Sequence, residues 1–227
     1  MLYIVPTPIG NLQDITLRAL EVLKSADVIF CEDTRRTQIL LSHFGLSKPT
    51  VRYNEHDERS VVRCLQQLQS GKTGALVSDC GTPCISDPGW KLVREAVKAG
   101  LPVSSLPGPS ALACALAGAG ITGGAFTFLG FLPRKPGKAA KMIASAYEQH
   151  IPVVLYESPY RVIKTLELIA NTLGEETPVV LARELSKVYE EWLRGTVREV
   201  IKNLSARPKV QGEFVILIEP LQQWLLA

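Results

Sequence analysis

The chain has 227 residues, a net charge of +3 and a hydrophobic fraction of 46%. It is long enough for one large or two small domains, and it has no apolar run near the roughly 18 residues of a membrane-spanning helix. A mildly basic chain does not by itself indicate a nucleic-acid partner, although local clusters of cations can. A strand-like run starts at Leu2, which leaves no room for a signal peptide, and an odd number of cysteines, five, is typical of reduced thiols. We therefore expect a cytoplasmic protein that does not span a membrane.

Strand-like apolar runs alternate with amphipathic segments through the first half of the chain. Thr16 is placed to cap a helix that begins near Leu17, and Asp87 is placed to cap a later helix. The sequence predicts strands at residues 2–5, 28–31, 74–77 and 103–106, and further helices at 34–44, 61–68, 90–99 and 111–119.

The alternation continues in the second half and favours an α/β fold, with two αβα domains built on mainly parallel sheets. A glycine-rich stretch at 119–124 interrupts it, so we expect domains at 1–119 and 120–227. The apolar tail, 221–227, is expected to pack on its own domain or on a second subunit. The predicted elements of this half are strands at 126–131, 153–156, 179–182 and 214–218, helices at 142–150, 162–173 and 197–204, and a basic loop at 133–138.

Loops with few bulky side chains follow predicted strands at 6–11, 77–89 and 107–110. In an open α/β sheet, ligands bind at the carboxyl ends of the strands, and small residues let a ligand approach the backbone. The three loops therefore indicate one nucleotide-sized ligand held largely by main chain. The chain has no G-x-G-x-x-G after the first strand, no P-loop motif and no G-x-S-x-G elbow.

Charged residues also follow predicted strands. Arg35 and Arg36 come in the first turn of a helix, where a cation is disfavoured by ~0.3–1 kcal/mol. They indicate an anionic partner, or else they form ion pairs with Glu32 and Asp33. Asp79 follows the third strand, where it either bonds a ligand hydroxyl or amine or fastens its own loop.

Two further groups of charges lie in the second half. Arg183, Glu184 and Lys187 follow a strand and either face the ligand cleft or form a surface ion-pair cluster. The loop with Arg134, Lys135 and Lys138 is either a solubilising loop or a flexible phosphate clamp.

Cys80 and Cys84 are four residues apart. Without a second ligand pair this spacing is a weak zinc signal, so we expect two small loop thiols and no metal.

These motifs, in this order, resemble the bacterial 16S ribosomal RNA cytidine 2′-O-methyltransferases of the tetrapyrrole (precorrin) methylase superfamily. The resemblance covers nearly the whole chain and implies S-adenosylmethionine as methyl donor. It also implies two α/β domains, a homodimer with the donor between the domains, and 16S ribosomal RNA or the small ribosomal subunit as partner. The segments that carry it are 6–12 with 14–16, 31–35, 78–89, 107–111 and 182–185.

Matching positions give a set of expected donor contacts. Asp79 is added to this set because of its place after a strand. Cys80 and Cys84 stand where the family usually has Ala and Gly, and Gln211 stands where it often has Lys. The residues assigned to the donor by position are Pro8, Thr82, Ile85, Ser86, Ser110, Ala111, Tyr156 and Ala182.

The implied reaction is attack of a ribose 2′-oxygen on the donor methyl group. Positioning can supply ~7–11 kcal/mol and a general base a factor of ~10²–10⁴, so positioning can carry the larger share. Asp33 and Glu184 are the expected proton acceptors. The residues expected to hold RNA phosphates are Arg35, Arg36, Arg134, Lys135, Lys138 and Arg183.

Two other functions stay open at this point. A methylase of a tetrapyrrole or another small molecule could use the same fold, because a polycarboxylate substrate also favours arginine. A non-catalytic RNA-binding or donor-sensing module could share the loops without turnover. The nucleotide that is modified, and whether the target is naked RNA or the assembled subunit, are not specified by the sequence.

Overall fold

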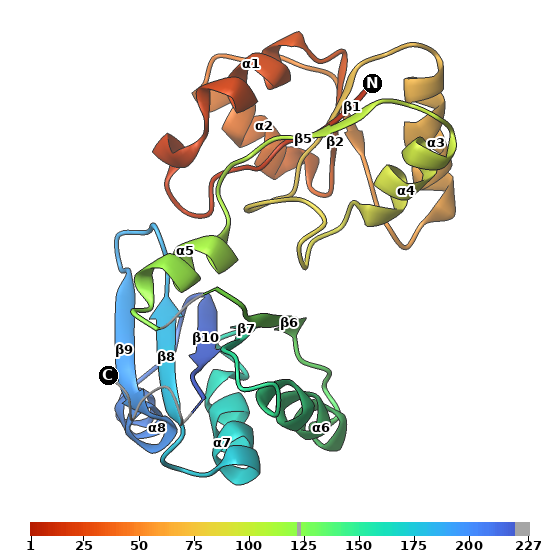
Figure 1. Cartoon of the computed structure of the whole chain (residues 1–227). Helices are drawn as coiled ribbons and strands as arrows, with labels where there is room; N and C mark the ends of the chain where they lie inside the picture. Colours follow the sequence, from red (N-terminus) through yellow and green to blue (C-terminus); the bar gives the residue numbers. More distant parts are fainter. Residues whose placement is uncertain (122–123, 221–227) are drawn as a thin grey trace. The chain divides into compact units, whose positions relative to one another are not determined.

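The structure is a computed structural model that describes residues 1–121 and 124–220. It divides into two compact units, of which the first is Met1–Ser110 and the second begins at Ala111 (Figure 1). The division lies one helix earlier than the boundary expected after Ala119, because helix α5 (Ala111–Gly118) packs on a strand of the second unit. Residues 122–123 of the expected boundary and the apolar tail lie outside the described residues.

The first unit is a parallel sheet with helices on both faces (Figure 1). Helices α1 (Leu17–Ser25) and α2 (Thr34–His43) pack on one face, and α3 (Glu58–Gln69) and α4 (Trp90–Lys98) pack on the other. A short 3-10 turn, η1 (Leu12–Asp14), follows the first loop. The strand order is β3 (Thr50–Arg52), β2 (Val28–Cys31), β4 (Gly74–Leu76), β1 (Leu2–Ile4) and β5 (Val103–Ser105), with every neighbouring pair parallel.

The second unit has a mixed sheet. Helices α6 (Pro136–Tyr147), α7 (Val162–Leu173) and α8 (Val197–Ser205) share one core with the sheet, and α5 packs against β10. The β6–β7 pair is parallel and the other three pairs are antiparallel. The strand order is β6 (Thr127–Phe131), β7 (Val153–Glu157), β10 (Phe214–Ile218), β8 (Pro178–Arg183) and β9 (Glu191–Thr196).

The predicted α/β class with helices on both sheet faces is confirmed. The expected mainly parallel sheet is found in the first unit and not in the second, because β8 and β9 form a hairpin and β10 runs antiparallel to both of its neighbours. Thr16 caps α1 as predicted, since its side chain accepts a hydrogen bond from the Ala19 N–H. Strand β9 has no counterpart in the sequence prediction. It is an edge strand whose residues are half-buried or exposed, and it contains Arg194 and Gly195, so it lacks the apolar run of a buried strand.

Two local predictions are wrong. The basic loop ends at Lys135, because Pro136 occupies the first position of α6. Proline is favoured there, since its missing N–H is not needed in the first turn. Lys138 therefore lies on the helix and not in a loop.

Asp87 is not the N-cap residue of α4. The N-cap residue is Gly89, with φ of 142° and no side-chain cap. The Gly89 N–H instead donates to Glu55 Oε2 at 3.0 Å. A carboxylate from the segment between β3 and α3 thus stabilises the start of α4, which local sequence spacing cannot reveal.

Within the described residues, every helix is too short or too polar to cross a lipid bilayer.

Candidate binding and catalytic site

The loops after β1, β4 and β5 meet in the first unit. Thr7 and Gly81 exchange two backbone hydrogen bonds, of 2.9 and 3.0 Å. Thr82 Oγ1 donates to the Pro109 carbonyl at 2.9 Å. Gly108 lies so close to Pro6 that a Cβ on Gly108 would come within 2.7 Å of the Pro6 Cβ. The three loops singled out in the sequence are therefore one contiguous structure.

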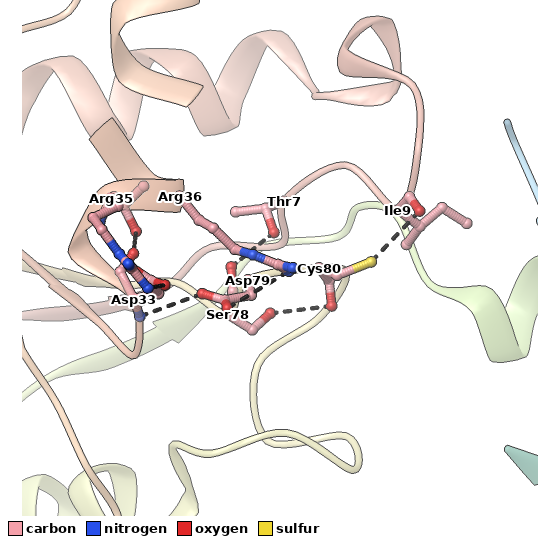
Figure 2. A network of polar contacts seen from close by, with 9 residues as sticks. Thr7, Ile9, Asp33, Arg35, Arg36, Ser78, Asp79 and Cys80 are labelled. Atoms are coloured by element: carbon pink, nitrogen blue, oxygen red, sulfur yellow. Dashed lines mark hydrogen bonds and ion pairs between the residues drawn. The ribbon is translucent and has the colours of Figure 1, made fainter. Parts of the chain in front are cut away.

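Side-chain hydrogen bonds within the loop after β4, and between it and the first loop, stabilise its conformation as well (Figure 2). Thr7 Oγ1 donates to the Ser78 carbonyl at 3.0 Å, and Ser78 Oγ donates to the Gly81 carbonyl at 3.0 Å. Cys80 Sγ lies 3.5 Å from the Ile9 carbonyl. Because buried backbone groups need partners, these bonds fix the loop shape before any ligand arrives.

A hollow of about 190 Å³ lies between the first loop, the end of β4 and α2. Small-molecule sites commonly measure roughly 300–1,000 Å³, so this hollow suits part of a ligand. Its walls are apolar or hydroxyl-bearing apart from Arg36 and Asp79. The lining residues are Thr7, Pro8, Leu12, Arg36, Thr37, Ile39, Leu40, Val77, Ser78 and Asp79.

A second hollow, of about 340 Å³, lies at the carboxyl ends of β2 and β3. Asp79 lines both hollows and so stands between them. Arg52 also lines the second hollow, although it belongs to none of the predicted motifs. Its position at the end of a short strand was the available signal. The lining residues are Glu32, Asp33, Thr34, Arg35, Arg52 and Asp79.

Asp33 caps α2 and pairs with Arg35, two residues later. Its carboxylate accepts hydrogen bonds from the Arg35 backbone N–H at 2.9 Å and from Arg35 Nη2 at 2.8 Å. These bonds hold the pKa of the Asp33 carboxyl well below its usual value. The ion-pair alternative for Arg35 is therefore realised, yet its side chain remains 87% exposed and open to another anion.

Asp79 links the two strand ends. Its Oδ1 accepts from the Asp33 N–H at 3.4 Å, and its Oδ2 lies 3.7 Å from Arg36 Nη1 (Figure 2). Both arginines predicted to meet an anion thus lie beside carboxylates, Arg35 in the lining of the second hollow and Arg36 in the lining of the first.

Glu184 lies in the second unit, in a turn after β8 with φ of 53°. Its Oε1 accepts from Lys187 Nζ at 2.9 Å and from the Glu213 N–H at 2.9 Å. Burial of this carboxyl favours the neutral form, but the bonds from Lys187 and Glu213 outweigh it, and the pKa of Glu184 lies below its usual value. The predicted ion-pair cluster is present here.

Arg183 is also paired. Its Nε donates to the Gln211 carbonyl at 2.6 Å, and its Nη1 lies 3.4 Å from Glu191 Oε2. Since the contact uses the backbone of Gln211, the side chain at that position can vary without losing it.

The remaining residues assigned to the donor are divided between the units. Ser110 ends the first unit and Ala111 opens the second. In the second unit, the Tyr156 hydroxyl accepts from the Leu112 N–H at 3.0 Å. Ala182 is fully buried within β8. Ile85 and Ser86 are exposed in the loop after β4.

Arg134, Lys135 and Lys138 are exposed at the start of α6, as both a solubilising surface and a phosphate clamp require.

No group of three or more histidine, cysteine or acidic residues among the described residues could hold a metal ion. Burial raises the pKa of the Cys84 thiol to about 11, so this side chain is neutral near pH 7.

Known proteins match nearly the full chain. The family model of the tetrapyrrole (corrin/porphyrin) methylases matches residues 1–201. The ribosomal RNA small subunit methyltransferase I of Hydrogenobaculum sp. (strain Y04AAS1) is 44% identical over 96% of this chain and 94% of its own length. The protein of the same name from Thermotoga maritima is 42% identical over 96% of this chain and 97% of its own length.

Solved structures share the fold. A conserved hypothetical protein from Aeropyrum pernix K1 is 20% identical, with a TM-score of 0.75 over 100% of this chain and 88% of that chain. A cobalt precorrin-4 methyltransferase is 18% identical, with a TM-score of 0.70 over 100% of this chain and 95% of that chain. The motifs, the fold and these matches agree, and the chain belongs to the tetrapyrrole methylase family together with the relatives named ribosomal RNA small subunit methyltransferase I.

Proposed function

We propose that this protein transfers a methyl group from S-adenosylmethionine to the ribose 2′-oxygen of a cytidine in 16S ribosomal RNA. The observation that carries the proposal is the junction of the three strand-end loops, which borders an apolar hollow and a charged one across Asp79. The name of the relatives, ribosomal RNA small subunit methyltransferase I, supports the ribosomal substrate.

The first-unit hollow suits the proposed donor. An adenosyl sulfonium has a flat apolar part that suits the apolar walls of the hollow. Its positive charge would share the Asp79 carboxylate with Arg36, which lies 3.7 Å from Asp79 in the same lining. The size of the hollow accommodates only part of the molecule. The resemblance assigns the rest to Tyr156 and Ala182 of the second unit. When bound, the donor supplies an activated methyl group, so the protein has to bind, orient and exclude water.

Asp33 and Glu184 are the proposed proton acceptors for the 2′-hydroxyl. Both carboxyls have lowered pKa values, so both are ionised near pH 7 and able to accept a proton. A base is most effective when its pKa is near the working pH. Cations hold the pKa of both carboxyls below that range. We therefore expect the one that accepts the proton to accelerate the reaction by a factor near the lower end of ~10²–10⁴. Positioning would supply the larger part of the rate.

RNA phosphates would be held by the exposed cations. Arg35 of the first unit borders the charged hollow and Arg36 borders the apolar one, and Arg134, Lys135 and Lys138 surround the start of α6. Arg183 would have to exchange its contact with Glu191 to take part. On the resemblance, we further propose that the protein is cytoplasmic and a homodimer, and sedimentation equilibrium tests the oligomeric state.

The direct test is incubation with methyl-labelled S-adenosylmethionine and three acceptors: small ribosomal subunits, naked 16S ribosomal RNA, and a tetrapyrrole. We expect label in RNA, at a cytidine whose 3′-phosphodiester resists alkaline hydrolysis because its 2′-oxygen is methylated. Label in the tetrapyrrole alone would replace this proposal with the small-molecule function. Donor binding without label in any acceptor would indicate the sensing module.

Site variants refine the test. We expect Asp33→Asn and Glu184→Gln to separate the two candidate bases, with a loss of ~10²-fold in kcat for the residue that accepts the proton. If about three phosphates are bound on a single strand, log K should fall with log salt at a slope of roughly −2. An affinity that is independent of salt would contradict the assigned phosphate contacts.

A further inference from the structure

Two aromatic side chains are exposed at one edge of the second unit's sheet. Phe131 ends β6 and is 56% exposed, and Tyr160 follows β7 and is 91% exposed. Strands β6 and β7 are parallel neighbours, with Phe131 beside Tyr156 in the register. Neither the ring nor the hydroxyl of Tyr160 has a partner among residues 1–121 and 124–220.

A buried charged group fixes the turn that carries Tyr160. The Glu157 side chain is 1% exposed and accepts from the Ser158 N–H at 2.8 Å and from Thr165 Oγ1 at 2.7 Å. Arg161 Nη2 lies 3.4 Å from Glu157 Oε2 and donates to the Leu132 carbonyl at 3.1 Å. The residue after Tyr160 is thus bonded to the residue after Phe131. The exposed tyrosine therefore stands on a rigid turn that is joined to the end of β6.

The same edge is strongly basic. Arg134, Lys135, Lys138 and Lys141 follow the end of β6, and residues 132–147 contain no aspartate or glutamate. All four cations are exposed, and none forms an ion pair within the described part of the chain. Lys138 and Lys141 are three residues apart on α6 and so lie on one side of the helix.

We propose that Tyr160, with Phe131 at the end of the neighbouring strand, is a stacking platform for unpaired bases of the RNA substrate, and that the cations of α6 hold the adjoining phosphates. Aromatic rings beside a basic surface are how proteins bind single-stranded RNA, because every base has a face that can stack. This inference rests on the proposed function for its choice of RNA. It adds that the target segment is single-stranded where it meets the second unit.

A second exposed tyrosine of the same unit offers a contrast. Tyr189 is 73% exposed in the turn between β8 and β9. The nearby cation, Lys187, is already bound to Glu184 and Glu213, and Glu190 adjoins Tyr189 in the chain. An acidic neighbourhood repels phosphate, so we do not expect the Tyr189 ring to stack on a base, and the roles proposed for Arg183 and Glu184 do not need this ring.

The test measures affinity for a fluorescein-labelled, mixed-sequence, single-stranded RNA by anisotropy, across a series of salt concentrations. Tyr160→Ala is expected to weaken binding roughly 5- to 100-fold, with no change in the slope of log K against log salt. Tyr160→Phe should bind like the wild type, since stacking needs only the ring. Lys135→Ala and Lys138→Ala should each reduce the magnitude of the slope by about 0.7. Tyr189→Ala is the matched control and should leave both affinity and slope unchanged.

Three outcomes would overturn the platform. The first is an equal loss of affinity for single-stranded RNA in Tyr160→Ala and Tyr189→Ala. The second is that Tyr160→Ala weakens binding to the annealed RNA duplex, which offers no unstacked base, as much as it weakens binding to the single strand. The third is a change of oligomeric state in Tyr160→Ala, by sedimentation, which would make this edge a self-association surface.

Failure of the proposed function can be distinguished from failure of the stacking inference. If wild-type protein does not methylate RNA, that proposal fails whatever the binding data show. If wild type methylates RNA and Tyr160→Ala binds single strands as tightly as wild type, the stacking inference alone fails. The donor affinity of Tyr160→Ala, measured by calorimetry, should equal that of the wild type.

Discussion

Arg35 reaches back over the first turn of α2 to the carboxylate of Asp33. The pair holds the pKa of Asp33 below its unfolded-state value of about 3.9. A carboxyl whose pKa is lower in the folded state stabilises the fold above the unfolded pKa, and that contribution is lost as the pH falls below about 4. The pair therefore does not make the protein sensitive to pH near neutrality.

Replacement of Arg35 by alanine should raise the pKa of the Asp33 carboxyl toward about 3.9, because the bonds from the guanidinium are the largest cause of its lowering. Titration of the carboxyl carbon by nuclear magnetic resonance measures this. Arg36→Ala is the control, since its side chain contacts Asp79 and not Asp33. An unchanged Asp33 pKa in Arg35→Ala would contradict the proposed cause.

Thr82 joins the loops after β4 and β5 through one hydroxyl. Thr82→Val keeps the shape and removes the donor, so the free energy of unfolding should fall by about 1 kcal/mol, and the loops should hold S-adenosylmethionine less tightly. Urea denaturation and calorimetry measure the two effects. Thr82→Ser retains the hydroxyl and should restore the bond. Equal donor affinity in Thr82→Val and wild type would exclude the loop junction from the donor site.

Helix α4 depends on a glycine for its first turn. At Gly89 the φ angle is 142°, and an added Cβ would lie 2.8 Å from Cys84 Sγ and 2.9 Å from Leu76 Cδ2. Gly89→Ala should therefore cost about 3 kcal/mol of stability through strain and collision. Gly100→Ala has open space around the new Cβ and should cost only about 1 kcal/mol. Thermal or urea unfolding of the two variants tests the difference, and equal losses would show that crowding around Gly89 is unimportant.

The turn between β7 and α7 depends on the buried Glu157. Glu157→Ala leaves Arg161 without its carboxylate and should destabilise the protein by about 3 kcal/mol. The control is Glu175→Ala. Glu175 lies 3.8 Å from Arg198 on the surface, so this variant should lose less than about 1 kcal/mol of the free energy of unfolding. Comparable denaturation midpoints for both variants would contradict a structural role for Glu157.

The sequence predicted most elements because their signals are local. Buried strands such as β2 and β10 are short apolar runs, and Thr16 is a capping residue at the start of an amphipathic pattern. The start of α6 was missed because proline followed by glycine also describes a turn. The cap of α4 was missed because its acceptor, Glu55, lies 34 residues earlier in the chain.

Each unit has its own hydrophobic core, in the first unit on both sheet faces and in the second around α6, α7 and α8. A ligand that binds only the folded protein stabilises it by about 2.7 kcal/mol at a concentration 100 times its Kd. S-adenosylmethionine at that excess should therefore raise the unfolding temperature measured by calorimetry. If the units unfold in separate steps, a donor bound by residues of both should shift both transitions. A shift confined to one transition would limit the donor to that unit.

The sequence by itself determined the α/β class, the strand-end loops and the motifs that place the chain in its family, because each depends on residues close together in the chain. The tertiary structure decided which residues meet. It joined the three loops through Thr7, Gly81 and Thr82, brought Arg52 to the charged hollow, and bonded Arg161 to Leu132 beside the basic helix. Such contacts join residues that are distant in the chain. They arise only from the packing of whole strands and helices, so local sequence patterns do not predict them.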